Sequence, residues 1–302
     1  MDYQSTNKIF IVEPVAFGYN AETAQNNYFQ QRDNAPESEI QSKALSEFNN
    51  FASKLREHNI DVKIFKDTLV PLTPDSIFPN NWISFHADKT IALYPMFAKN
   101  RRLERRSDII ESFKNERIID YSVFEKNNLY LEGTGSMILD RVNKIAYAAL
   151  SERTSKELLL QFCADFSYEA VCFHSFHTVA NKRLPIYHTN VMMSVADTYA
   201  LICLDSIDDK NERKMLTDKL NITVKEIIEI TEEQILNFAG NMLQVRNAAN
   251  ENMLVMSQSA FDSLTPKQIS KLKTYNEFIV ASIPTIEKYG GGSVRCMIAE
   301  IF

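Results

Sequence analysis

The sequence has 302 residues, 45% of them hydrophobic and 24% charged, so the chain is long enough to bury a large core. Its formal net charge of −6 disfavours nucleic acid and an anionic membrane surface as partners, because both attract basic proteins. The composition therefore favours a small-molecule ligand.

Two further features predict a cytoplasmic protein that is not exported. The first residues contain no basic segment followed by an apolar stretch, and no apolar run approaches about 18 residues. The four cysteines lie far apart and lack CxxC spacing, which is typical of reduced thiols in a cytosol: Cys163, Cys172, Cys203 and Cys296.

The expected strands and helices follow one recurring order along the chain. A strand at residues 8–12 precedes a helix over about 36–58 and a strand at 62–65. Apolar or alternating runs predict further strands at 90–94, 144–148, 170–173, 199–204 and 278–281. A capping box at Thr154 and a second helix start at Thr265-Pro266 predict helices after two of these strands.

A short motif opens each of five copies of this pattern, at intervals of roughly fifty to sixty residues. The motifs are anchored at Asn81, Glu132, His188, Gly240 and Cys296. The fifth copy ends after its first strand, and the strand at 8–12 lacks a partner, so we expect the two termini to complete one unit. Five such units predict a closed α/β propeller that forms a single domain over residues 1–302. An ordinary α+β protein with chance spacing is the alternative.

The last motif is Gly290-Gly291-Gly292-Ser293-Val294-Arg295-Cys296, in a chain with only seven glycines. Three consecutive glycines indicate a positive φ or a close approach of the backbone to a ligand. Such a loop can hold a nucleophilic thiol at the mouth of a cleft. A tight turn before a last strand, with a buried cysteine, is the alternative interpretation.

If the motif starts meet at one end of a common axis, they bring Asn81, Glu132, His188, Asn190 and Cys296 to one pocket. A thiolate could then attack an electrophilic carbon while the imidazole exchanges protons and the carboxylate orients it. Taken singly, Glu132 could be a turn residue and His188 a hydrogen-bonded core histidine.

The motifs occur in the order Phe78-Pro79-Asn80-Asn81, Leu131-Glu132-Gly133-Thr134-Gly135, His188-Thr189-Asn190 and the glycine run with Cys296. This order resembles the guanidino-group-modifying, or amidinotransferase, superfamily, which includes arginine deiminase, dimethylargininase and glycine amidinotransferase. The resemblance spans nearly the whole chain and implies the five-bladed pentein propeller. It also implies that Cys296 is the nucleophile, His188 the general acid and base, and Glu132 the carboxylate that contacts the substrate nitrogen and the histidine.

Asn81 and Asn190 stand where, by this resemblance, relatives carry aspartates that bind a guanidinium. Asparagine removes the counter-charges of a cation but offers the donor and acceptor that suit a neutral ureido group. The chain most resembles the citrulline-utilisation hydrolase branch, which implies release of ornithine, carbon dioxide and ammonia from citrulline through a covalent cysteine intermediate. The alternatives are a deiminase or dimethylargininase type of hydrolase, an amidinotransferase, and a non-catalytic pentein that binds a partner.

The remaining features predict no cofactor and no metal. A metal site built from Cys172, His174, His177 and His188 is disfavoured, because strand alternation sends His177 to the opposite face from the first two. The basic cluster at residues 99–106 predicts a solvated helix start, with an anion site or a subunit contact as the alternative, so homo-oligomer formation stays open. Arg183 and Arg295 are candidates for binding the substrate carboxylate.

Overall fold

The computed structural model describes residues 3–113, 117–223 and 226–302, which form an α/β fold. Within these residues, five sheets have three strands each. They are β3 (Ile83–Phe85), β4 (Thr90–Leu93) and β5 (Arg117–Asp120); β6 (Ile138–Asp140), β7 (Ile145–Ala149) and β8 (Glu169–Phe173); β11 (Met193–Val195), β12 (Tyr199–Ile202) and β13 (Glu226–Glu229); β14 (Leu243–Arg246), β15 (Asn252–Ser257) and β16 (Glu277–Ala281); and β17 (Ala299–Ile301), β1 (Lys8–Glu13) and β2 (Asp61–Lys66).

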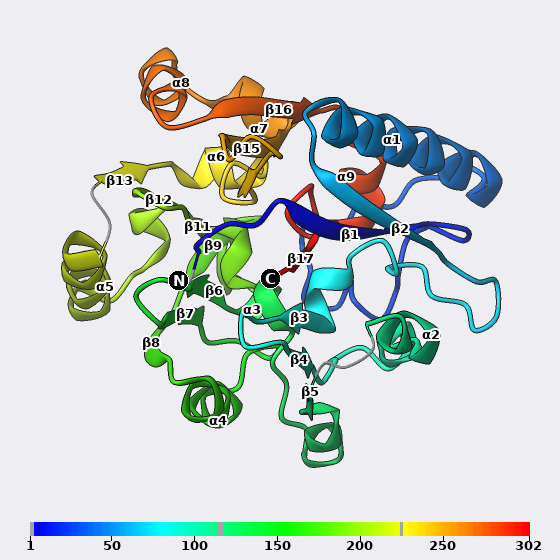
Figure 1. Cartoon of the computed structure of the whole chain (residues 1–302), viewed down its shortest axis with the longest axis horizontal. Helices are drawn as coiled ribbons and strands as arrows, with labels where there is room; N and C mark the ends of the chain where they lie inside the picture. Colours follow the sequence, from blue (N-terminus) through cyan, green and yellow to red (C-terminus); the bar gives the residue numbers. More distant parts are fainter. Residues whose placement is uncertain (1–2, 114–116, 224–225) are drawn as a thin grey trace.

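All five sheets have the same internal arrangement. The first strand pairs antiparallel with the second, and the second pairs parallel with the third. A parallel pair needs a crossover, and helices between the second and third strands supply it. Figure 1 shows the sheets placed around a centre, with these helices on the outer rim. The two ends of the chain share one sheet, because Ile9 on β1 pairs with Glu300 on β17.

The α-helices are α1 (Glu37–Glu57), α2 (Ser107–Glu111), α3 (Gly133–Ser136), α4 (Lys156–Phe166), α5 (Lys210–Thr223), α6 (Glu232–Leu236), α7 (Gln258–Ser263), α8 (Pro266–Lys273) and α9 (Pro284–Gly290). Short 3₁₀ helices are η1 (Pro79–Asn81), η2 (Asn100–Glu104), η3 (Ser122–Asn127), η4 (Thr189–Val191) and η5 (Leu204–Ser206). No helix within the described ranges is both long and apolar enough to cross a membrane.

The core lies between the sheets and the helices that cover them. Helix α1 buries Ile40, Ala44, Phe48 and Leu55, which follow the helical repeat and pack with the inner residues of β1. The strands β4 and β7 are buried at every position, which is why their sequences are almost wholly apolar.

The two helix starts predicted from the sequence differ in outcome. Helix α8 begins at the expected Thr265-Pro266, and Thr265 and Gln268 bond each other's backbone there in a capping box. The capping box at Thr154 is wrong, because the N-cap is Ser155 and its side chain makes no cap hydrogen bond. The hydroxyl of Ser155 instead accepts a hydrogen bond from the backbone N–H of Tyr130.

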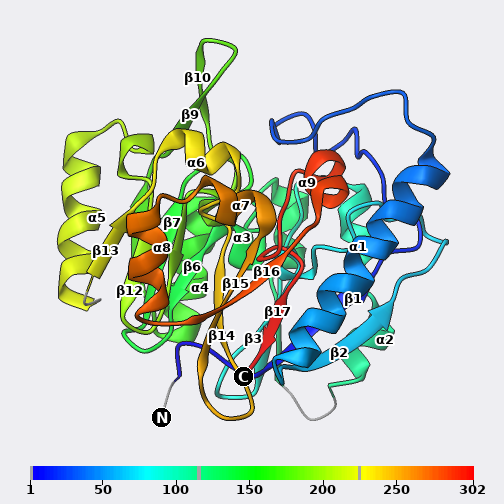
Figure 2. The same cartoon turned by 90° about the horizontal axis from the view of Figure 1, so that it is seen from above.

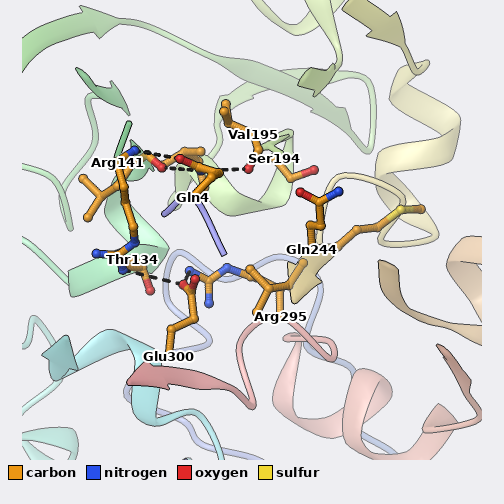
Figure 3. A pocket seen from close by; sticks show the side chains of 12 residues that line it. Gln4, Thr134, Arg141, Ser194, Val195, Gln244, Arg295 and Glu300 are labelled. Carbon is orange, nitrogen blue, oxygen red and sulfur yellow. Dashed lines mark hydrogen bonds and ion pairs between the residues drawn. The ribbon is translucent and has the colours of Figure 1, made fainter. Parts of the chain in front are cut away.

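The hairpin of β9 (Phe176–Val179) and β10 (Lys182–Pro185) is an insertion into the repeating pattern. Figure 2 shows that it projects from one side of the molecule, while both termini lie on the opposite side. Two cavities lie near the centre between these sides. One is lined by the turns that precede the first strands, and the other by the first strands β6, β11, β14 and β17 themselves (Figure 3).

Candidate active site

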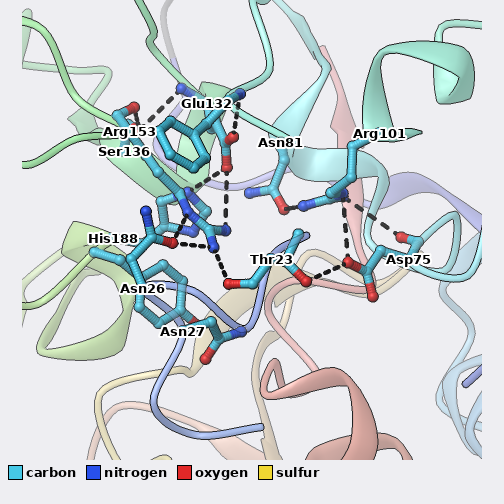
Figure 4. A network of polar contacts seen from close by, with 12 residues as sticks. Thr23, Asn26, Asn27, Asp75, Asn81, Arg101, Glu132, Ser136, Arg153 and His188 are labelled. Atoms are coloured by element: carbon cyan, nitrogen blue, oxygen red, sulfur yellow. Dashed lines mark hydrogen bonds and ion pairs between the residues drawn. The ribbon is translucent and has the colours of Figure 1, made fainter. Parts of the chain in front are cut away.

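The five residues predicted from the sequence lie in equivalent turns, each just before the first strand of a sheet. Asn81 ends η1, Glu132 precedes α3, and His188 and Asn190 lie at the start of η4 and within it. Cys296 lies between α9 and β17. All five are buried, and Figure 4 shows Asn81, Glu132 and His188 converging in one polar network.

Close packing of α3 against η1 and η4 brings these turns together. A Cβ atom at Gly133, whose φ is +49°, would lie 2.3 Å from the carbonyl oxygen of Asn80. A Cβ atom at Gly135 would lie 2.3 Å from Asn81 Nδ2 and 2.9 Å from His188 Nδ1. The two glycines of the Glu132 motif are therefore required for the approach of the neighbouring motifs.

Glu132 and His188 form a hydrogen bond of 2.7 Å between Oε2 and Nε2. Burial raises the pKa of Glu132, but Arg153 and His188 outweigh it and hold that pKa at about 2. Burial lowers the pKa of His188 to about 4, although Glu132 opposes the change. At neutral pH the pair is therefore a carboxylate and a neutral imidazole, with the Nε2 proton held by Glu132 and Nδ1 left to accept a proton.

The Cys296 thiol has two amide groups against its sulfur atom. Asn190 Nδ2 lies 3.4 Å from Sγ, and Asn241 Nδ2 lies 3.2 Å from it. Asn241 also accepts a hydrogen bond of 3.1 Å from the backbone N–H of Arg295, which fixes its amide orientation. Both amide groups therefore direct an N–H donor at the sulfur atom.

Asn241 is a residue that the sequence interpretation missed. It follows Gly240, the anchor of the fourth repeat, so it occupies a motif position like those of Asn81 and His188. Its position in the repeat could have indicated a site residue. The residue type could not, because asparagine is neither a nucleophile nor an acid or base.

Two amide atoms at the site have no hydrogen-bond partner within the described part of the chain. Asn81 Oδ1 accepts a 2.8 Å hydrogen bond from Arg101 Nη1, and Asn81 Nδ2 is buried and unpaired. Asn190 donates to Cys296, and Asn190 Oδ1 is buried and unpaired. Asn81 lines the cavity with His188 and Cys296, whereas Asn190 does not; each still leaves one buried polar atom without a partner, which is unusual in a folded protein.

Arg101 corrects the interpretation of the basic cluster at residues 99–106. The cluster begins a 3₁₀ helix, but Arg101 itself is buried rather than solvated. Its guanidinium donates to Glu104 at 2.9 Å through both Nε and Nη2, and its Nε lies 3.9 Å from Asp75. Asp75 accepts hydrogen bonds from Asn20 and Thr23 through Oδ2, while Oδ1 has no partner among the residues described.

Arg153 is a second cation at this cavity that the sequence interpretation missed. Its Nη1 lies 3.6 Å from Glu132 Oε2, and its guanidinium lies over the Tyr187 ring at 4.7 Å. It also donates to the backbone carbonyl of Thr23 at 2.7 Å and to the side chain of Asn26. The segment between β1 and α1 therefore binds this guanidinium from across the cavity (Figure 4).

The two arginines predicted to bind a carboxylate lie elsewhere. Arg183 is on β10 and pairs with Asp208 and Glu232. Arg295 lines the other cavity, together with Arg141 and Glu300. The prediction that Arg183 and Arg295 bind the substrate carboxylate is therefore wrong for this cavity, because neither residue lines it.

The cavity itself is small. Its lining includes His188, Cys296, Asn81, the glycines at 290–292 and, from the segment after β1, Thr23 and Asn27. Its volume of about 20 Å³ is enough for a single water molecule. An amino acid does not fit in this volume, so parts of the lining must move before one can bind.

Solved structures of low sequence identity share this fold. The N-terminal domain of ArgZ, an arginine dihydrolase from the ornithine–ammonia cycle in cyanobacteria, was solved bound to product; it is 15% identical, with a TM-score of 0.73 over 98% of this chain and 97% of that chain. AgrE in a ternary complex with ornithine and NAD⁺ is 16% identical, with a TM-score of 0.75 over 98% of this chain and 39% of that chain. A mutant DDAH from Pseudomonas aeruginosa, complexed with citrulline, is 17% identical, with a TM-score of 0.64 over 98% of this chain and 99% of that chain. None of the curated proteins matches the chain.

The fold and its family define a cysteine hydrolase of the guanidino-group-modifying superfamily, which acts on non-peptide C–N bonds. More narrowly, the chain belongs to the family described as N,N dimethylarginine dimethylhydrolase, eukaryotic, whose model matches residues 13–302.

Proposed function

We propose that the protein hydrolyses citrulline to ornithine, carbon dioxide and ammonia. The observation that carries this proposal is the pair of unpartnered amide atoms, the donor Asn81 Nδ2 and the acceptor Asn190 Oδ1. A neutral ureido group has a carbonyl that accepts and an NH₂ group that donates, so it complements both atoms. A cationic guanidinium would find no carboxylate at either position, and a buried cation without counter-charge is costly.

The first half of the reaction forms a covalent intermediate. The Cys296 thiol passes its proton to the neutral His188 as Sγ attacks the ureido carbon, and the oxyanion that develops accepts a hydrogen bond from Asn81 Nδ2. The bond from this carbon to the ornithine nitrogen then breaks, and His188 delivers the proton that the leaving amine needs. The products of this half are ornithine and an S-carbamoyl thioester on Cys296.

Water completes the reaction in the second half. His188 takes a proton from the water, which attacks the thioester carbon and releases the Cys296 thiolate. Carbamate leaves and decomposes to carbon dioxide and ammonia, so one citrulline and one water yield one molecule of each product. Glu132 holds the imidazole in the required tautomer throughout, as its 2.7 Å hydrogen bond indicates.

The amino acid end of the substrate is assigned to Asp75 and Arg153. The unpaired Asp75 Oδ1 suits an α-ammonium group, and a substrate carboxylate could replace Thr23 and Asn26 as the acceptor for Arg153. For the α-ammonium group to reach Asp75 and the carboxylate to reach Arg153, the segment that carries Thr23 and Asn26 must move away from the cavity.

A second candidate is hydrolysis of arginine or a methylated arginine, by a deiminase, dimethylargininase or dihydrolase type of reaction. The family match favours it, as do the fold relatives ArgZ, named an arginine dihydrolase, and DDAH. A dihydrolase would still hydrolyse a ureido intermediate in its second half, for which the asparagine pair is suited. An amidinotransferase and a non-catalytic binding protein have no specific observation in their favour.

We further propose that the five three-stranded sheets are the blades of one closed pentein propeller that spans residues 1–302. The common strand order of the sheets and the shared sheet of the two termini support this arrangement. Such closure leaves each blade without a free inner edge.

The test is a product assay with purified protein on citrulline, arginine and mono- and dimethylarginine, in which ornithine, citrulline and ammonia are measured separately. We expect citrulline to yield equal amounts of ornithine and ammonia, and Cys296→Ser to abolish turnover while leaving the unfolding transition unchanged. Conversion of arginine to citrulline, with no attack on citrulline, would contradict the proposal in favour of a deiminase. Full activity of Cys296→Ser would remove the cysteine mechanism altogether.

A further inference from the structure

The second central cavity contains three buried charged side chains. Arg141, Arg295 and Glu300 line it, and each is less than a tenth exposed. Figure 3 shows the two guanidinium groups on either side of the Glu300 carboxylate. The cavity is distinct from the candidate active site, because the two cavities share no lining residue, although Arg295 comes from the turn that holds Cys296 and Thr134 from the turn that follows Glu132.

The charges around this cavity do not balance. Glu300 Oε2 lies 3.2 Å from Arg295 Nη2 and 3.8 Å from Arg141 Nη2, so one carboxylate faces two guanidinium groups. Every other lining residue is uncharged: Gln4, Thr134, Ile138, Leu139, Ser194, Val195, Met242, Leu243 and Gln244. The lining therefore carries a net positive charge on side chains that are each less than a tenth exposed, where an unpaired charge is unfavourable.

The hydrogen bonds that the two guanidinium groups make to protein use only some of their donors, and none of their nitrogen atoms is both fully buried and unpaired among the residues that the structure describes. Each guanidinium carries five N–H donors. Arg295 donates to the carbonyl of Ile298 and to Glu300, and Arg141 donates to the carbonyl of Phe85 and pairs with Glu300. One face of Arg141 is covered by the Phe302 ring, 3.9 Å from Cζ. The remaining N–H donors belong to Arg141 and Arg295, which both line the cavity (Figure 3).

The size of the cavity restricts what could bind. Its volume of about 30 Å³ holds the equivalent of two water molecules. The apolar side chains Ile138, Leu139, Val195, Met242 and Leu243 form much of the wall. An amino acid or a nucleotide is too large for this space, whereas a small inorganic anion fits.

We propose that this cavity binds one small inorganic anion of the halide class between the guanidinium groups of Arg141 and Arg295. The anion accepts hydrogen bonds from both groups and cancels the excess positive charge of the lining. Because Arg295 directly precedes Cys296 in the chain, the anion lies behind the turn that holds the thiol.

The titration of Arg295 is consistent with an excess of positive charge around the cavity. Burial lowers the pKa of Arg295, and Arg141 lowers it further, while Glu300 acts in the opposite direction. A bound anion would oppose the effects of burial and of Arg141 on the pKa of Arg295.

Bromide is the probe that tests the proposal, because its anomalous scattering locates it. Crystals of the whole protein grown without halide and soaked in bromide should show an anomalous peak between Arg141 and Arg295. Bromide bound beside Arg101 or Arg153 in the other cavity would appear as a separate peak and would not count in favour. Absence of a peak between Arg141 and Arg295 would overturn the proposal.

Chloride-35 line broadening measures the same binding in solution. We expect Arg141→Gln to weaken binding by about tenfold or more, because it removes a charged donor. Arg246→Gln is the matched control, since Arg246 pairs with Asp197 outside the cavity lining, and it should bind chloride like the parent protein. A crystal peak without saturable binding in solution would also overturn the proposal, because it would indicate an adventitious ion only. If Arg141→Gln fails to fold, the parent protein's bromide peak and saturable binding still decide the outcome.

Discussion

Glu132 and His188, from different repeats of the chain, are joined by a hydrogen bond of 2.7 Å between two almost fully buried side chains. The bond makes the carboxylate the partner of Nε2 and leaves Nδ1 as the basic nitrogen. It also connects the two turns that carry these residues. The same hydrogen bond therefore contributes both to the geometry of the site and to the stability of the fold.

This pair predicts a loss of stability in acid. The pKa of His188 is lowered from 6.5 to about 4, so below pH 6.5 the unfolded chain binds a proton that the folded chain does not. The pKa of Glu132 is lowered from 4.5 to about 2, so its contribution is present above pH 4.5 and is lost as the pH falls toward 2. The free energy of unfolding should therefore decrease on acidification, first through His188 and then through Glu132.

Urea unfolding at a series of pH values measures this decrease. In His188→Asn the fall between pH 6.5 and 4 should be shallower by roughly 2 kcal/mol, while the fall below pH 4.5 should be smaller but still present, because Arg153 continues to lower the pKa of Glu132. His58→Asn, at the end of α1, should retain the full slope. Identical slopes for His188→Asn and the parent protein would show that His188 is not held neutral by burial.

Gly135→Ala should inactivate the protein without unfolding it. Its Cβ atom would lie 2.3 Å from Asn81 Nδ2 and 2.9 Å from His188 Nδ1, so both side chains must move. Displacement of catalytic groups by about 1 Å can reduce kcat/KM about 100-fold. Gly18→Ala, with no atom within 4 Å of the added Cβ, is the control for activity and melting temperature. Normal turnover in Gly135→Ala would argue against a role for this packing.

Asn241→Asp should slow alkylation of Cys296. The substitution keeps the size of the side chain but replaces the Nδ2 donor, 3.2 Å from Sγ, by an oxygen that carries negative charge. The thiolate then loses a hydrogen bond and gains a repulsive neighbour, so carbamidomethylation by iodoacetamide at pH 7 should fall about tenfold or more. Mass spectrometry of the Cys296 peptide gives the rate, with Asn237→Asp on the surface as control. An unchanged rate would exclude Asn241 as a support of the thiolate.

Exchanging the asparagine pair for aspartates should change the substrate preference. Asn81→Asp combined with Asn190→Asp adds two carboxylates, which favour a guanidinium over a neutral ureido group. The ratio of kcat/KM for arginine to that for citrulline should rise about tenfold or more. Asn50→Asp, on the exposed side of α1, should leave the ratio unchanged. If the double variant keeps the parent ratio, these two positions do not detect substrate charge.

Asp75→Asn should weaken recognition of the α-amino group. The variant keeps the shape of the side chain but removes the negative charge whose Oδ1 is unpaired. We expect KM for citrulline to rise about tenfold, with a much smaller effect on an analogue that lacks the α-amino group. An equal loss for both compounds would indicate that Asp75 acts only in holding Arg101 and the segment around Thr23.

Several parts of the fold could be predicted because they depend on local sequence. The apolar runs of β4 and β7, the helical repeat of α1 and the start of α8 at Thr265-Pro266 are set by neighbours a few positions away. The recurrence of motifs then related Glu132, His188 and Cys296, since equivalent positions of a repeat occupy equivalent places in the structure. Their burial and the contacts of Glu132 with His188 agree with that expectation.

Other parts of the site depended on how distant segments meet. Arg101 belongs to a basic run that is typical of solvent-exposed helices, and only the approach of Glu104 and Asp75 makes its burial favourable. Arg153 lies far from Thr23 and Asn26 in the chain, and Arg295 lines a different cavity from Cys296, which directly follows it. No pattern in the sequence indicates which cavity an arginine reaches.

By itself, the sequence determined the order of strands and helices, the five motif positions and the residue types available for thiol chemistry, because periodicity and turn composition act over short distances. The tertiary structure decided which charges pair, which amide atoms remain free and which arginines surround each cavity. Those outcomes depend on contacts between segments that are distant in the sequence. Such contacts bury polar groups, and because a buried polar group without a partner is unfavourable, they select one arrangement of partners.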